Sequence, residues 1–198
     1  MSAYSKIKNS LILIITLMVI ASGIILWNQL KLQHTFTMLQ VTTQVDQSLL
    51  ECRRQEKNFI LRQDSISQQE FGAAFQSLTT SISTLDSVLQ SAGFPDSIHG
   101  LVPRISRNAT EYRNQFDQVG QMERPTSASL LRYEEVSSQL VQYARAIHDD
   151  VDRIRQAVRQ RFESVATSSN VINIAAFLVG LFLSVLIAGY LVDQFRED

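Results

Sequence analysis

The stretch from Glu51 to Arg62 (ECRRQEKNFILR) holds the side chains of this sequence that are best suited to chemistry. Read as a helix, it places the carboxyl group of Glu56 at the centre of an apolar stripe, beside Cys52 and Phe59. A carboxylate alone in an apolar interior costs several kcal/mol or takes up a proton. Glu56 therefore requires a hydrogen-bond donor on its own helix or on a neighbouring one.

Two kinds of donor are available to Glu56. A neighbouring arginine is one, and the phenol of Tyr143 is the other, because counting along the two outer helices places Tyr143 near the height of Glu56. The sequence leaves two interpretations open. Either the pair is an internal polar clasp that fixes the register of the helices, or Glu56 belongs to a pocket between helices. In such a pocket an anionic ligand would be bound by basic residues: Arg53, Arg54 or Lys57.

No motif of an enzyme accompanies this stretch. The sequence contains no Walker loop, no HExxH and no CxxC. Its three histidines are far apart in height along the expected helices, so a shared metal ion is not expected: His34, His99 and His148. Cys52 is the single cysteine, which excludes an intrachain disulfide. We expect no enzymatic activity and no cofactor, and the net charge of −1 gives no reason to expect nucleic-acid binding.

Two uncharged apolar runs, residues 10–30 and 171–192, flank the polar part of the chain. A bilayer core requires about 20 apolar helical residues, so both runs are predicted to be transmembrane helices. A cleaved signal peptide is the alternative for the first run. The run continues through Trp27, beyond the usual length of a signal-peptide core, and this favours an uncleaved anchor.

Basic residues predict the orientation of the chain in the membrane. Lys6 and Lys8 precede the first run, which favours a cytoplasmic segment 1–9. Residues 31–170 are then exported, and residues 193–198 return to the cytoplasm as a short tail.

The exported segment has apolar residues spaced by three and four, as in helices that bury one face. The stripes are interrupted at QDSISQ (63–68), SAGFPDS (91–97) and GQMERPTSAS (120–129). These breaks predict an all-α fold, an antiparallel four-helix bundle whose first and last helices continue into the membrane. Asp64 or Ser65 is the expected N-cap of the second helix, and Gly93 its C-terminal glycine. Pro103 indicates that the third helix begins nearby or is kinked there.

RRQEKNFILR resembles the RRxEKDFLLR signature near the end of the first helix in extracytoplasmic helical sensor domains. These domains, of the four-helix-bundle and helical bimodular types, belong to bacterial chemoreceptors and sensor histidine kinases. Asn58 replaces the aspartate and Ile60 a leucine. The resemblance implies a periplasmic bundle on the bacterial inner membrane, a homodimer, and binding of small molecules such as organic acids. The length of the exported segment suits a single bundle.

Small residues recur every four positions on the second span, at Ala176, Gly180, Ser184 and Ala188. This spacing lets helices approach closely, so this face is expected to contact the first span or the partner of a dimer. We expect a sensor of chemotaxis or two-component signalling that binds a small anionic ligand and transmits by displacement of the second span. Six residues follow that span, so we expect either a fragment of a longer sensor or a chain whose output passes through a cytoplasmic or membrane signalling partner. A membrane-anchored helical adaptor without a ligand is the alternative.

Overall fold

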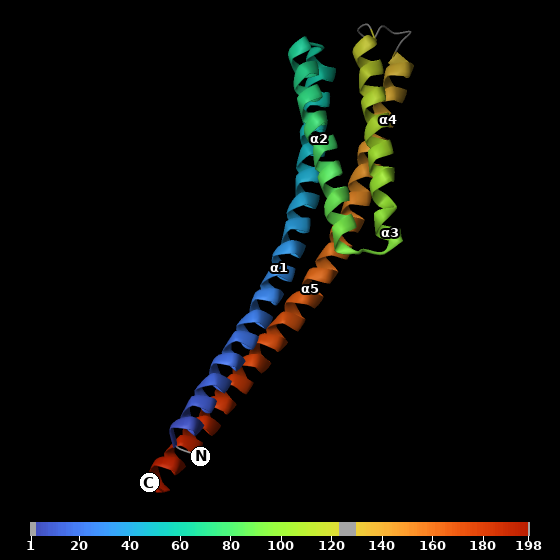
Figure 1. The fold of residues 1–198 in the computed structure, drawn as a ribbon. Coiled ribbons are helices and arrows are strands. Elements are labelled where there is room, and N and C mark those ends of the chain that lie inside the picture. The colour runs from blue at the N-terminus through green and yellow to red at the C-terminus, as the bar shows by residue number, and fades with distance from the viewer. Residues whose placement is uncertain (1–2, 123–129, 198) are drawn as a thin grey trace. The chain divides into compact units, whose positions relative to one another are not determined.

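The fold, a computed structural model, is all-α (Figure 1). It describes residues 3–122 and 130–197, and no strand occurs in these two ranges. The helices are α1 (Ala3–Arg62), α2 (Ser65–Ala92), the single turn α3 (Asp96–His99), α4 (Leu101–Gln121) and α5 (Leu130–Glu197). The chain divides into two compact units, residues 36–160 and residues 1–35 with 161–198, and each is described separately below.

The turn between α1 and α2 confirms one of the two predicted caps. The carboxylate of Asp64 accepts a hydrogen bond from the backbone N–H of Ser67 at 2.7 Å and so satisfies one free donor of the first turn of α2. Gln63 ends α1 in the left-handed conformation, with φ of 54°. This conformation was not predictable from the sequence, because a left-handed residue at a helix end is usually glycine.

The structure also agrees with the predictions made for the end of α2 and the start of α4. Gly93 caps α2 in the left-handed conformation, with φ of 63°, as its place before Pro95 predicts. Pro103 lies in the first turn of α4, where its missing N–H costs no helical hydrogen bond. The predicted break at 120–129 lies mostly outside the described residues.

The unit of residues 36–160 has an apolar core contributed by all four long helices. Polar contacts also join the helices in pairs. Ser48 of α1 lies 3.1 Å from Ser77 of α2 between hydroxyl oxygens, and Arg104 of α4 forms a bidentate ion pair with Asp150 of α5. The hydrogen bonds that Arg104 donates to the Asp150 carboxylate raise the pKa of its guanidinium.

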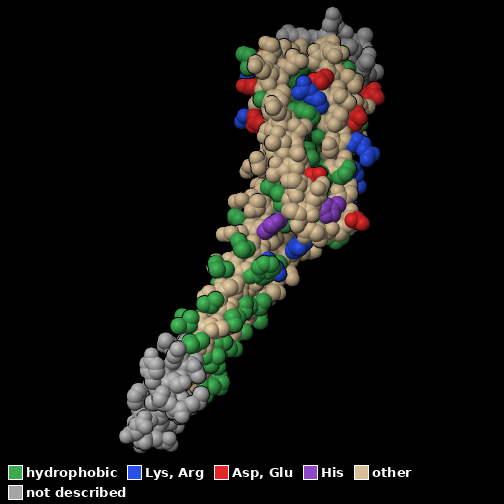
Figure 2. Space-filling model, viewed as in Figure 1, with side chains coloured by type: hydrophobic (Ala, Val, Ile, Leu, Met, Phe, Trp, Pro, Cys, Tyr) green, Lys and Arg blue, Asp and Glu red, His purple; other side chains and the backbone are tan. Residues whose placement is uncertain are grey.

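The second unit holds the two apolar runs. Both α1 and α5 contain a segment that is long and apolar enough to cross a membrane. Most of the exposed large apolar side chains of the described chain fall within residues 12–30 and 171–192. Figure 2 shows such side chains spread over the surface of this unit. An apolar surface of this extent is suited to lipid rather than to water.

Candidate functional site

Glu56 is buried and holds α1 against α4. Its side chain is 2% exposed, and both of its carboxylate oxygens accept hydrogen bonds at 2.5 Å from one guanidinium nitrogen of Arg53. The phenol of Tyr112, on α4, donates a further hydrogen bond to Oε2 at 2.5 Å. The carboxylate therefore has the donors that its burial requires.

The prediction that Tyr143 is the phenolic donor was wrong. Tyr112 takes this role, whereas Tyr143 lies half-buried on α5 against the core. The prediction compared positions along α1 only with positions along the last helix. A buried side chain of α1 also faces α4. The expectation of a neighbouring arginine is confirmed by Arg53.

The environment keeps the Tyr112 phenol protonated. Burial raises its pKa, and the charge and hydrogen bond of Glu56 raise it further. Burial likewise raises the pKa of the Cys52 thiol to about 12, so this cysteine is not poised for reaction. The cluster thus has the character of a fixed polar contact.

Aromatic rings pack around the Glu56–Tyr112 pair. Phe71 of α2 stacks on Phe116 of α4 with ring centroids 3.5 Å apart, and its ring lies 5.7 Å from that of Tyr112. The guanidinium of Arg113 lies 5.5 Å from the centroid of Phe71, within the range of a cation–π contact. These contacts fix α4 and α2 next to the buried carboxylate.

Arg53 also lines an open groove between α1 and α5, with a volume of about 340 Å³. That volume lies at the lower end of the range for small-ligand sites. The groove combines apolar and charged side chains: Asp46, Leu49, Leu50, Arg53, Val141, Ala144, Arg145 and His148. Leu50 and Val141 are 68% and 38% exposed, so they offer an apolar wall to an incoming molecule.

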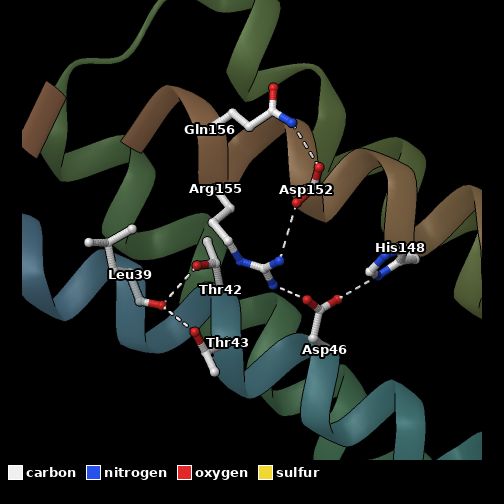
Figure 3. A network of polar contacts seen from close by, with 8 residues as sticks. All are labelled: Leu39, Thr42, Thr43, Asp46, His148, Asp152, Arg155 and Gln156. Atoms are coloured by element: carbon white, nitrogen blue, oxygen red, sulfur yellow. Dashed lines mark hydrogen bonds and ion pairs between the residues drawn. The ribbon is translucent and has the colours of Figure 1, made fainter. Parts of the chain in front are cut away.

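At one end of the groove, Asp46 of α1 is held by two residues of α5 (Figure 3). Nδ1 of His148 lies 3.2 Å from one carboxylate oxygen, and Arg155 donates to the other. A second nitrogen of Arg155 donates to Asp152 at 3.3 Å. This network joins α1 to α5 through Asp46, whose side chain is 14% exposed.

The charges around the groove do not cancel. Asp46 is paired with Arg155, and Arg53 is paired with Glu56. Arg145 has no ion-pair partner in the part of the chain that the structure describes. The groove therefore carries an uncompensated positive charge on an exposed side chain, which favours an anionic group of a ligand.

Of the basic residues singled out in the sequence, the structure brings only Arg53 to this groove. Arg54 is 68% exposed and pairs with Glu51 at 2.7 Å, and Lys57 is exposed outside the groove lining. Asp46, Arg145 and His148 were missed as site residues. Of these three residues, only Asp46 could have been noticed in the sequence, because it follows the apolar Val45 at the edge of the helical stripe.

Three of the four small residues of the second apolar run face a crevice inside their own unit. Ala176, Gly180 and Ser184 line an apolar space of about 430 Å³ together with residues of α1, among them Met18 and Ala21. Ala188 does not line it and is exposed. A Cβ atom added at Gly180 would meet nothing within 4 Å, so the space beside it is open.

No protein-family model matches this chain, and no curated protein or solved structure is significantly similar to it.

Proposed function

We propose that this chain is a membrane-anchored sensor module whose exported part binds a small anionic ligand in the α1–α5 groove. The observation that carries the proposal is the position of Arg53. Its guanidinium is held by the buried Glu56, and its side chain, which is 21% exposed, lines the groove, where Arg145 adds a second cation. Arg53 is held in place and Arg145 is not, and both lie beside an apolar wall. This combination suits a small carboxylate.

In this proposal α1, α2, α4 and α5 form an antiparallel four-helix bundle in the periplasm of a bacterial cell. The pairwise contacts of Ser48 with Ser77, of Arg104 with Asp150 and of the Glu56–Tyr112 pair support the arrangement. Residues 10–30 and 171–192 would cross the inner membrane, with both termini in the cytoplasm.

Signal transmission would pass along α5. This helix is continuous from Leu130 to Glu197, so it contains both one wall of the groove and the second apolar run. A ligand that binds one packing of α5 against α1 more tightly than another shifts the population toward that packing. The output would reach a cytoplasmic or membrane signalling partner, in chemotaxis or in two-component signalling.

A thermal-shift measurement on the full chain in detergent tests the proposal with a panel of carboxylates and amino acids. A compound present at about 100 times its Kd stabilises the folded chain by about 2.7 kcal/mol. We expect a carboxylate to raise the melting temperature of the native chain and of Arg107→Ala, a control at an exposed α4 position outside the groove. The same compound should not raise the melting temperature of Arg145→Ala.

The competing function is a helical adaptor that acts through a protein partner without a ligand. Exposed Leu50 and Val141 are compatible with it, since apolar side chains on a surface also serve protein contacts. If no compound of the panel raises the melting temperature, the adaptor function is favoured.

A further inference from the structure

The unit of residues 1–35 with 161–198 contains two buried amide atoms whose hydrogen bonds are not made. In the described part of the chain three buried side-chain atoms lack a hydrogen-bond partner, and two of them belong to this unit: Nδ2 of Asn28 and Oδ1 of Asn173. Asn28 is only 8% exposed. A polar atom that is buried without a partner costs free energy, so both amides require a molecule that supplies the missing bonds.

Both amides belong to one end of the apolar space beside Ala176, Gly180 and Ser184, which we call the small-residue crevice. Asn173 is itself a lining residue. Asn28 follows Ala21, a lining residue of α1, by seven positions or two helical turns, so the two share one helix face.

The two amides also lie at similar height in this unit. Within it, α1 and α5 run side by side in opposite directions (Figure 1). Asn28 lies two residues before the end of the first apolar run, and Asn173 lies two residues after the start of the second. An unused donor and an unused acceptor therefore mark the same end of the crevice.

The rest of the small-residue crevice is apolar. Its volume of about 430 Å³ lies within the range of small-ligand sites, and no charged residue lines it. The hydroxyl of Ser184 donates to the carbonyl of Gly180 at 2.8 Å, so its hydrogen is already used. The lining extends along α5 from Asn173 to Ile187, a length of about 21 Å. The crevice thus combines one polar end with a long apolar remainder.

We propose that the small-residue crevice binds an amphiphile dissolved in the membrane, with a neutral hydroxyl head group and a linear apolar tail. A hydroxyl group can accept from Nδ2 of Asn28 and donate to Oδ1 of Asn173, which satisfies both amides at once. A charged head group suits the crevice less, because no lining residue carries a counter-charge. The proposal rests on the membrane placement within the proposed function, and not on carboxylate binding in the α1–α5 groove.

Photolabelling of the full chain in phosphatidylcholine vesicles tests the site, with a diazirine-bearing dodecanol as the probe. The segments of α1 and α5 that line the crevice should take up most of the label, and an excess of dodecanol should compete for it. Uniform labelling along both apolar runs, labelling without competition, or no labelling would overturn the proposal.

Two glycines of the second apolar run provide matched variants. A Cβ atom added at Gly180 or at Gly189 meets nothing within 4 Å, but only Gly180 lines the crevice. Gly180→Leu should fill the space and abolish the competed labelling, whereas Gly189→Leu should leave it unchanged. Equal effects of the two substitutions would place the probe elsewhere and refute the site.

The role of the amides is tested by removing one partner of the hydrogen bond at a time. The methyl ether of the probe, which has no hydroxyl hydrogen, should label the native chain about three- to tenfold less than the alcohol. Asn173→Leu removes the acceptor, so the alcohol and the ether should label this variant equally. If both probes label the native chain equally, the crevice accepts any alkyl chain, those of lipids included, and a hydroxyl ligand is excluded.

Extraction of the same membranes with alkaline carbonate separates this proposal from the proposed anchorage. A chain that resists extraction and shows no competed labelling refutes the crevice site alone. A chain released by carbonate refutes the anchorage and the site together. Competed labelling of a chain whose melting temperature responds to no carboxylate supports the site and refutes only the ligand of the α1–α5 groove.

Discussion

The phenol of Tyr112 and the carboxylate of Glu56, which lie 56 residues apart in the chain, are joined by a buried hydrogen bond of 2.5 Å. The bond links α1 to α4, and Arg53 supplies the counter-charge from one turn away. A buried polar contact of this kind constrains how the two helices slide past each other, because another register would leave the carboxylate without its donors.

Tyr112→Phe should therefore lower the free energy of unfolding by about 1–3 kcal/mol, since a buried carboxylate loses a donor while the ring remains. Tyr143→Phe is the matched control and should be close to neutral. Chemical denaturation of the full chain in detergent measures both. Equal effects of the two substitutions would contradict the assignment of Tyr112 as the donor.

Adjacent arginines should differ sharply in their contribution to stability. Arg53→Ala removes the cation that is bonded to the Glu56 carboxylate, which is 2% exposed, and we expect a loss of about 3–5 kcal/mol. Arg54→Ala breaks an exposed pair with Glu51, and the loss should stay below about 1 kcal/mol. The same denaturation experiment compares them, and a larger loss for Arg54→Ala would reverse the assignment.

Asp64 should make part of the stability depend on pH. The hydrogen bond from the backbone of Ser67 lowers the pKa of the Asp64 carboxyl in the folded chain. Its contribution is therefore fully present above the unfolded pKa of about 3.9 and is lost as pH falls through the lower folded pKa. Asp64→Asn keeps a capping side chain that does not titrate. Melting temperatures of the two chains should converge in acid, and a constant difference at all pH values would exclude Asp64 as the cause.

Gln63 offers a site where stability can be gained. Its φ of 54° lies in the left-handed region, which is unfavourable for a residue with a Cβ atom and accessible to glycine. Gln63→Gly should raise the free energy of unfolding by about 0.5–1 kcal/mol, because relief of this strain exceeds the added entropy of the unfolded chain. Gln63→Ala, which retains the Cβ atom, should show no such gain.

The sequence alone determined the all-α fold, the two apolar runs and the ends of α2. Each of these follows from local rules. Apolar spacing sets the helical face, Asp64 caps a free N–H, and Gly93 adopts the positive φ that ends a helix. The requirement of Glu56 for hydrogen-bond donors also follows from its own helix. Arg53 could be predicted as a donor because it lies within one turn of Glu56.

Only the tertiary structure decided which distant residues meet. The choice of Tyr112 over Tyr143 depends on which helix faces Glu56, and periodicity within one helix does not encode that. The groove arises in the same way, since Arg53 and Arg145 come from separate helices whose relative rotation and height are set by packing of the whole core. Side chains far apart in sequence are brought together by burial summed over many contacts, and no short stretch of the chain contains that sum.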